Sequence, residues 1–301
     1  MGQERLQILL DAPSLKRVRA GEFNFFNRLM DIVQARGWSV EVTGNSPTDR
    51  ADARKWGGPT LLHMEEPTHA GALTCRRAYI GAFWRIEAEH ERWNWPVARA
   101  EFQPNEVDAA AAGKFFQNWR RWAFDGARGV GDDGFVLVPL QGRLLENRSF
   151  QSMSPVRMID HVLKRTDMPV LATLHPRETY TPEEIDALKA MAKANPRLEV
   201  EEASSDLMLR RCSFVVTQNS SLAFKGYFLE KPAVLFAEID FWHIAGSVPH
   251  HGLEAAFEHV KQQPDYARYL HWFLTSDTVN AGQEAFEETL PEKLRSHGWN
   301  I

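Results

Sequence analysis

The sequence predicts an α/β protein whose second half is a doubly wound domain. Short apolar strands alternate with amphipathic helices from residue 135 onward, and a polar residue follows each of the longer strands. Strands and helices that alternate at this spacing indicate a parallel sheet with crossover helices. The chain has 301 residues, 44% of them hydrophobic and 25% charged, which is typical of a globular protein with room for two domains.

The first half follows the same alternation less clearly. Hydrophobic periodicity predicts a strand at 6–12, a helix at 22–36, strands at 39–44 and 60–64, and a mostly helical segment over 70–125. The segment 125–134 has four glycines among ten residues and is the best linker. We therefore expect an N-terminal domain over 1–130 and a C-terminal domain over 131–301.

The second half has clear start signals for its helices. Ser154 and Pro155 open one helix as N-cap and first-turn proline, and Thr181 with Glu184 forms a capping box for the next. A short helix is expected at 205–211 and another after Ser220. The predicted strands lie at 135–140, 169–174, 198–200, 213–217 and 233–236.

Composition excludes several classes of function. The formal charge of −5 argues against nucleic acid as the main partner, because phosphate-backbone binding needs a basic face. Two cysteines, Cys75 and Cys212, are too few for a disulfide framework, and their spacing does not suggest zinc. We expect no signal peptide and no membrane span, and hence a cytoplasmic protein that reaches a membrane, if at all, from its surface.

Polar residues gather where the predicted strands of the second half end. Parallel sheets bind ligands at the carboxyl ends of their strands, so these residues predict a ligand crevice there. They include a histidine, amides, paired hydroxyls and carboxylates. The candidates are Gln141, Glu146, His175, Pro176, Glu178, Gln218, Asn219, Ser220, Ser221, Glu238 and His243.

The stretch Gln218–Ser221 suits an anion. A helix start offers free N–H groups, and small serines let a phosphate approach. The alternative is that Ser220 or Ser221 only caps the helix. His175 has three open roles: a donor to phosphate, an acid for a leaving group, or a structural ring held by the backbone. Pro176 favours a rigidly presented imidazole.

The order of motifs resembles the capsule polysaccharide biosynthesis family, which includes bacterial β-Kdo transferases. The resemblance covers residues 135–248 and rests on "VLVPLQ", "SMSPVRMIDHVL", "LHPRE", "VVTQNSSLAFKGYFLEKPAVLF" and "DFWHIA". It implies a GT-B fold: two Rossmann-like domains with a parallel sheet each and a cleft between them. The C-terminal domain would bind a nucleotide-activated sugar, CMP-Kdo where activity is established.

The resemblance also implies roles for single residues. His175 and Pro176 match an HP motif beside the CMP phosphate, Ser220 and Ser221 match the serine motif that cradles it, and Asn219 supports that loop. Gln141 matches the glutamine that closes the first strand. The aspartate that the family carries a few residues later is missing, and Glu146 is the nearest carboxylate. The "DDG" at 132–134 is similar to a motif that bacterial sialyltransferases carry before HP. Here it precedes the strand, and we treat the match as coincidence.

The first half would then bind the acceptor. It holds seven of the ten tryptophans, whose faces either stack on sugar rings or fill the core. A helix over 115–124 puts Phe115, Trp119 and Trp122 on one face, either for a membrane surface or for packing. The arginine-rich segment 75–93 is read as a helix that either faces an acidic sugar or forms surface ion pairs.

These observations predict a glycosyltransferase of surface polysaccharide assembly. The donor would be a nucleotide sugar, CMP-Kdo-like, with no metal and no further cofactor, and the acceptor a saccharide or lipid-linked saccharide at the inner membrane. Catalysis is assigned to His175, with Glu146 or Glu178 as base or nucleophile. The alternatives are a non-catalytic GT-B protein that binds polysaccharide or nucleotide, and a GT-B sugar-nucleotide epimerase.

Overall fold

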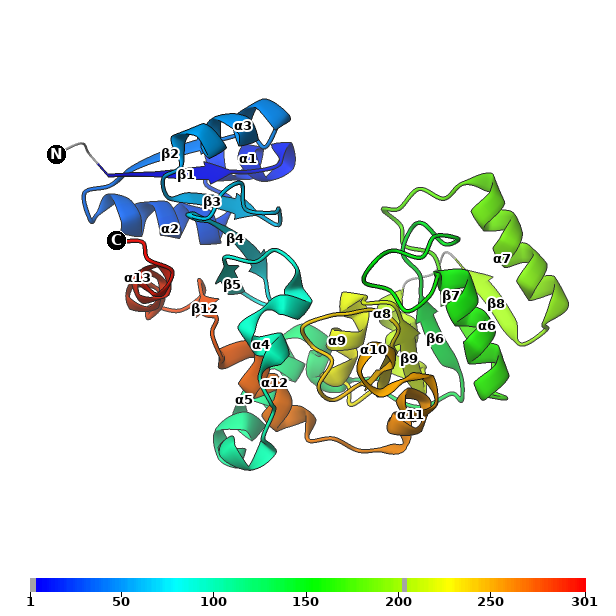
Figure 1. Ribbon diagram of the computed structural model, residues 1–301. Coiled ribbons are helices and arrows are strands. Elements are labelled where there is room, and N and C mark those ends of the chain that lie inside the picture. The colour runs from blue at the N-terminus through cyan, green and yellow to red at the C-terminus, as the bar shows by residue number, and fades with distance from the viewer. Residues whose placement is uncertain (1–3, 202–204) are drawn as a thin grey trace. The chain divides into compact units, whose positions relative to one another are not determined.

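A computed structural model describes residues 4–201 and 205–301. The chain forms two compact units, each built on its own sheet (Figure 1). Unit 1 comprises the residues up to Arg99 together with Leu274–Ile301, and unit 2 comprises Ala100–Phe273. The predicted fold class, two Rossmann-like α/β domains, is confirmed.

Sheet A of unit 1 has six strands in the order β12-β5-β4-β3-β1-β2. The strands β2, β1, β3 and β4 are parallel, whereas β5 runs antiparallel to both β4 and β12. Sheet A is therefore parallel over four strands and mixed at one edge. The strands are β1 (Arg5–Leu9), β2 (Ser39–Thr43), β3 (Thr60–His63), β4 (Ala72–Arg77), β5 (Phe83–Glu87) and β12 (Val279–Asn280).

Helices cover both faces of sheet A. In Figure 1, α1 and α3 lie on one side of the sheet, and α2 and α13 lie on the other. The main core joins Phe26 and Leu29 of α2 and Leu290 of α13 to the strand residues Leu6 and Ile8. The helices of unit 1 are α1 (Ala12–Arg19), α2 (Asn24–Gln34), α3 (Pro47–Trp56), α4 (Pro96–Arg99), α13 (Phe286–Ser296) and the 3₁₀ turn η1 (Arg92–Asn94).

Sheet B of unit 2 also has six strands, in the order β11-β10-β9-β6-β7-β8, and all neighbours are parallel. Strand order reverses beside β6, because β7 lies on one side of it and β9 on the other. Such a switch point is where an open α/β sheet binds its ligand. The strands are β6 (Val136–Pro139), β7 (Val170–Thr173), β8 (Leu198–Glu201), β9 (Phe214–Thr217), β10 (Ala233–Leu235) and β11 (Gly246–Ser247).

The helices of unit 2 begin with the predicted capping signals. Ser154 caps α6 and Thr181 caps α7, the latter with the full capping box to Glu184. The core on the α6 side joins Ile159 and Val162 to Val136 and Val138 of β6. The helices are α5 (Ala109–Phe124), α6 (Pro155–Arg165), α7 (Pro182–Ala194), α8 (Ser205–Arg211), α9 (Ser221–Tyr227), α10 (Val248–His251) and α11 (Leu253–Glu258), with α12 (Tyr266–Thr275) and three 3₁₀ turns, η2 (Pro104–Glu106), η3 (Asp125–Ala127) and η4 (His259–Lys261).

The units divide the chain differently from the expected boundary at 130/131. Helix α5 belongs to unit 2, where the Phe116 ring stacks on Phe228 with centroids 6.2 Å apart. The last residues return to unit 1, because β12 pairs with β5 and α13 supplies Leu290 and Leu294 to the core of sheet A. The glycine-rich segment 125–134 therefore lies within unit 2 and is not the boundary between the two units.

The helix predicted over 75–93 is wrong. This segment contains β4 and β5, which pair antiparallel, followed by η1. Arg85 is fully buried, and its guanidinium donates to the main-chain oxygen of Ser276 at 2.9 Å. Buried Glu87 accepts from Lys293 Nζ at 3.3 Å. The charged residues of this segment suggested an exposed helix. Arg85 and Glu87 instead lie in a buried strand, where their partners come from about 200 positions later in the chain.

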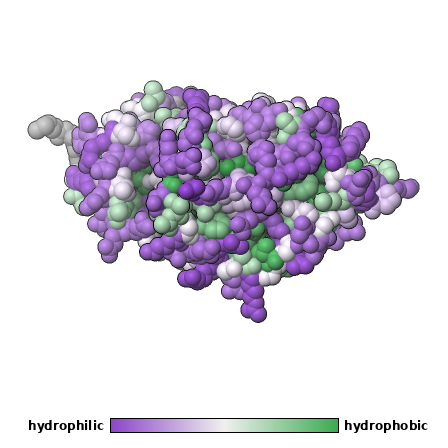
Figure 2. Space-filling view, turned by 90° about the horizontal axis from the view of Figure 1, so that it is seen from below, coloured by the Kyte–Doolittle hydropathy of each residue, from purple (hydrophilic) through white to green (hydrophobic). Residues whose placement is uncertain are grey.

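The aromatic face predicted on α5 is only partly covered. Trp122 is 69% exposed, while Phe115 and Trp119 are half-buried. Of the helices in the described part of the chain, none is long and apolar enough to cross a membrane. The face seen in Figure 2 is mostly hydrophilic, with hydrophobic residues in small scattered groups.

Candidate functional site

A pocket of about 290 Å³ lies at the carboxyl edge of sheet B, at the switch point beside β6. Three strand ends surround it: Leu140 follows β6, Thr173 ends β7, and Ser220 follows β9. Of the residues predicted to form a site, it brings together four. They are His175, Pro176, Ser220 and Ser221.

His175 is held by its own loop. Its backbone N–H donates to Tyr180 Oη at 2.8 Å, and its backbone oxygen accepts from the Glu178 N–H at 3.1 Å. Its ring Nδ1 accepts from the Arg177 N–H at 3.2 Å. A neutral imidazole that accepts at Nδ1 carries its proton on Nε2, so His175 has an Nε2–H to donate. The loop thus fixes both the ring and its tautomer.

The two serines divide the roles that the sequence left open. Ser220 is the N-cap of α9, and its Oγ accepts from the Leu222 N–H at 3.3 Å. Ser221 is exposed, and the hydrogen bond that caps the helix does not involve it. Both residues line the pocket. Capping explains Ser220 and leaves the Ser221 hydroxyl for a ligand.

The sequence reasoning missed the charged residues of the pocket. Arg177 and Lys225 supply two cations, and Asp206 supplies one carboxylate, whose Oδ1 lies 3.4 Å from Lys225 Nζ. With a neutral His175, positive charge exceeds negative charge, which favours an anionic ligand. A signal for Lys225 was present, because it lies four residues after Ser221 and so shares its helix face.

The predicted amides lie elsewhere. Gln218 is 2% exposed, and its Nε2 donates to the Met153 main-chain oxygen at 3.0 Å, which ties β9 to the segment before α6. Gln141 and Asn219 do not line the pocket. Gln218 therefore lies buried beneath the carboxyl edge of sheet B, and its side chain does not line the pocket.

The two candidate carboxylates also lie outside the pocket. Glu146 is exposed and pairs with Arg143 at 3.4 Å. Glu178 packs over Gly142, where a methyl group would come within 2.6 Å of its Oε2. Glu178 therefore contacts the loop after β6, and Gly142 leaves the room that this contact needs.

Glu184 joins the two loops that border the pocket. Its Oε1 accepts from the Leu144 N–H in the loop after β6, and its Oε2 accepts from the Thr181 N–H at 2.8 Å. The side chain is 6% exposed. A buried carboxylate with these two donors holds the loop after β6 against the start of α7.

Glu238 and His243 follow β10, and each has a partner outside the pocket. The Glu238 carboxylate lies 3.3 Å from His250 Nε2. His243 Nε2 donates to the Ala100 main-chain oxygen at 3.1 Å, so its Nδ1 accepts from Tyr269 Oη at 3.4 Å. Both ring nitrogens of His243 are thus engaged within unit 2.

Neither cysteine is exposed, and the described residues contain no cluster of His, Cys, Asp and Glu that could hold a metal ion. The "DDG" residues form a turn. Asp132 accepts from the Gly134 N–H at 2.9 Å, and Asp133 pairs with Arg211. Neither aspartate lines the pocket.

Comparison with known proteins identifies the fold. No protein-family model matches the sequence, and no curated protein matches it. Among solved structures, the β-Kdo 2,7-transferase of Thermosulfurimonas dismutans KpsC aligns over 99% of this chain and 100% of its own, with a TM-score of 0.54 and 12% identity. The fold is GT-B-like.

Two further structures are similar over most of the chain. The β-Kdo 2,4-transferase of the same KpsC covers 89% of each chain, with a TM-score of 0.47 and 12% identity. A UDP-GlcNAc 2-epimerase from Methanocaldococcus jannaschii covers 98% of this chain and 100% of its own, with a TM-score of 0.39 and 9% identity. At 12% identity, the likeness to the β-Kdo 2,7-transferase is one of fold.

Proposed function

We propose that this protein is a glycosyltransferase that takes its sugar from a nucleotide-activated donor, and that the pocket beside β6 binds the donor phosphate. One observation carries the proposal. His175, Arg177, Ser220, Ser221 and Lys225 meet at the switch point of a parallel sheet, which is where such sheets bind nucleotides. The proposed class of surface polysaccharide assembly follows the motif resemblance and the likeness in fold to a β-Kdo transferase.

Each residue has a part in the proposed reaction. The Ser221 hydroxyl, Lys225 and Arg177 bind the phosphate oxygens. Transfer breaks the bond between the anomeric carbon and a phosphate oxygen, and that oxygen keeps the electron pair. His175 donates its Nε2–H to the phosphate as this charge develops, which is the kind of stabilisation that accelerates group transfer most.

Charge favours a CMP-type donor over a UDP-type donor. A CMP-sugar has one phosphodiester with one negative charge, whereas a UDP-sugar has a diphosphate with two. The pocket offers two cations and one carboxylate, an excess of one positive charge with His175 neutral. We therefore propose a CMP-activated sugar as the donor, and we propose Kdo as that sugar from the motif resemblance alone.

The proposed reaction also needs a base that deprotonates the acceptor hydroxyl. The candidates remain Glu146 and Glu178, and both are close to the pocket in sequence but outside its lining. This placement supports a second candidate function, a GT-B-like protein that binds a nucleotide sugar without transferring the sugar. The saccharide or lipid-linked saccharide acceptor and the place of action at the inner membrane are proposed from the resemblance alone.

Thermal unfolding with CMP, UDP and GDP tests the proposal. Ligand at about 100 times its Kd stabilises the folded state by about 2.7 kcal/mol, so we expect CMP to raise Tm by about 5 °C. The double variant Ser220→Ala/Ser221→Ala should lose most of this shift. If none of the three nucleotides raises Tm, the proposal fails. Release of CMP from CMP-Kdo, with and without a Kdo-terminated acceptor, then separates transfer from binding.

A further inference from the structure

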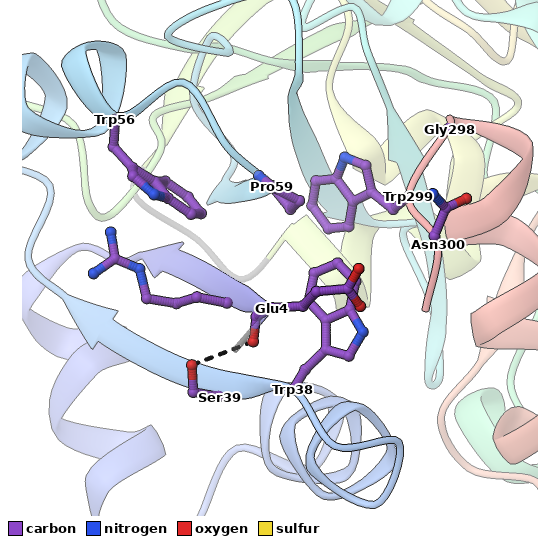
Figure 3. Close-up of a pocket in the computed structure, with 9 residues that line it drawn as sticks. Glu4, Trp38, Ser39, Trp56, Pro59, Gly298, Trp299 and Asn300 are labelled. Atoms are coloured by element: carbon purple, nitrogen blue, oxygen red, sulfur yellow. Dashed lines mark hydrogen bonds between the residues drawn. The ribbon is translucent and has the colours of Figure 1, made fainter. Parts of the chain in front are cut away.

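A second pocket lies in unit 1 and has different chemistry. Its volume is about 700 Å³, and three tryptophans line it: Trp38, Trp56 and Trp299 (Figure 3). The polar side chains around them are those of Glu4, Arg5, Ser39 and Asn300. Four segments far apart in the sequence meet here: the start of β1, the start of β2, the end of α3 and the residues after α13.

The pocket lies at the amino edge of sheet A. Strand β1 begins at Arg5, β2 begins at Ser39, and Pro59 directly precedes β3. All three strands are parallel, so their carboxyl ends, where His63 lies, form the opposite edge of the sheet. The pocket is thus distinct from any site at the carboxyl edge of either sheet, and the proposed donor pocket does not account for it.

Two of the tryptophans form rigid walls. Trp38 is 7% exposed and Trp299 is 4% exposed, and both belong to the core of unit 1. The Trp299 indole N–H donates to the Gly71 main-chain oxygen at 3.1 Å. Because core packing and this hydrogen bond fix them, these rings do not have to be ordered when a ligand binds.

Trp56 is the accessible aromatic residue. It ends α3, is half-buried, and lies over Gly58, where a methyl group would come within 2.4 Å of the indole. Because Gly58 has no side chain, the Trp56 indole can occupy this position. In Figure 3, Trp56, Pro59 and Trp299 lie along one side of the pocket, and Trp38 lies on the other side with Glu4.

The Arg5 guanidinium lies over the Trp56 ring, 4.4 Å from its centroid, and pairs with Glu41 at 3.3 Å. Both contacts are at the surface, where such interactions are weak. A ligand ring can therefore replace the guanidinium on the indole at small cost. The displaced N–H groups then face the ligand, together with the Glu4 carboxylate and the Asn300 amide.

We propose that this pocket binds a saccharide chain. A pyranose ring has an apolar C–H face, which packs on an indole, and an edge of hydroxyls, which bond to planar guanidinium, carboxylate and amide groups. A purely apolar ligand would strip water from Glu4 and Arg5 without replacing its hydrogen bonds. A phosphate-rich ligand would meet one carboxylate for each cation in the lining. The site would hold a glycan in unit 1, whereas the proposed donor pocket belongs to unit 2, and its existence does not depend on the proposed transferase activity.

Saturation-transfer NMR and isothermal titration calorimetry on the full chain test the proposal. The probes are maltotriose, triacetylchitotriose and a synthetic Kdo disaccharide, each added without nucleotide. We expect at least one probe to bind, and Trp56→Ala to weaken its binding by about tenfold. Trp56→Phe, which keeps an aromatic face, should recover most of the affinity.

Two more variants keep the test decisive. Asn300 is exposed, so Asn300→Ala leaves the fold intact and should weaken binding about threefold. Trp122→Ala removes a tryptophan that is 69% exposed in unit 2 and should leave binding unchanged. The proposal is overturned if none of the three saccharides binds, or if Trp56→Ala and Trp122→Ala have the same effect.

Discussion

The pocket beside β6 in unit 2 and the tryptophan-lined pocket of unit 1 lie at opposite kinds of sheet edge and differ in the chemistry of their linings. The pocket in unit 2 lies at the carboxyl edge of sheet B and is lined by hydroxyls, a histidine and two cations. The pocket in unit 1 lies at the amino edge of sheet A and is lined by three tryptophans, with one cation and one carboxylate. Similar α/β architecture thus builds one site suited to an anion and another suited to a sugar ring.

The difference follows from how each edge is made. At the carboxyl edge of sheet B, the strands continue into loops and helix starts, which expose N–H groups, hydroxyls and His175. At the amino edge of sheet A, the surrounding residues come from a helix end and from the return of the last residues of the chain, which bring large side chains. The first edge supplies hydrogen-bond donors for the proposed phosphate, and the second supplies aromatic surface for the proposed saccharide.

The strongest test of this difference removes the proposed hydrogen-bond donor of His175 and leaves its loop intact. In His175→Asn, the Asn oxygen keeps an acceptor near the position of Nδ1 for the Arg177 N–H, but the Nε2–H donor is lost. We expect sugar transfer to fall by about 10²–10³-fold, with CMP binding reduced far less. Steady-state release of CMP measures the first effect and calorimetry the second. Equal losses in both would make His175 a binding residue.

A smaller effect is expected from the charge of the pocket. Lys225→Gln should weaken CMP binding about tenfold, because a cation that bonds phosphate oxygens is lost. Lys261→Gln is the matched control, since Lys261 also pairs with a carboxylate, Glu258, at 2.6 Å, but lies outside the pocket. Fluorescence or calorimetric titration with CMP measures the affinity of both variants. Equal losses of CMP affinity would contradict the assignment of Lys225 to the binding pocket.

A third prediction concerns buried titratable groups in unit 1. Burial raises the pKa of Glu87 to about 7, against the opposing charge of Lys293, and burial lowers the pKa of His63 to about 4. Between the usual pKa of Glu and pH 7, folded Glu87 holds more protons than the unfolded chain, so its contribution to stability falls as pH rises. Folded His63 holds fewer protons between pH 4 and 6.5, so its contribution rises with pH.

These two slopes oppose each other between about pH 4.5 and 6.5. Glu87→Gln removes the falling slope and leaves the rising one. We expect its free energy of unfolding, relative to wild type, to increase by about 1–2 kcal/mol across this window. Urea unfolding at several pH values measures the difference. A constant difference would mean that Glu87 is ionised throughout the window in the folded state.

The contrast between the units also shows what the sequence can predict. In unit 2, strand and capping signals gave every strand from β6 to β10, because each strand is apolar and each helix start is local. In unit 1, β4 and β5 were read as a helix, because Arg85 and Glu87 are satisfied by partners in the last residues of the chain. A window of sequence cannot show a partner that far away.

The position of the candidate pocket at the carboxyl edge of sheet B was predictable from the sequence. Reading the residues after each strand found His175, Ser220 and Ser221, since β7 and β9 flank β6 at the switch point. It did not show in which direction each side chain points, so it also selected Gln218, which is buried beneath the edge, and His243, whose two ring nitrogens are engaged. Arg177 and Lys225 were missed because their place depends on the loop and on the helix face.

The most direct test of the central claim is a titration of the ¹⁵N-labelled protein with CMP, followed by backbone amide NMR. If CMP binds beside β6, the shifted amides cluster at residues 173–177 and 219–225, while the amides of Trp38, Trp56 and Trp299 do not shift. Shifts that cluster around the three tryptophans, or no shifts at millimolar CMP, would contradict it.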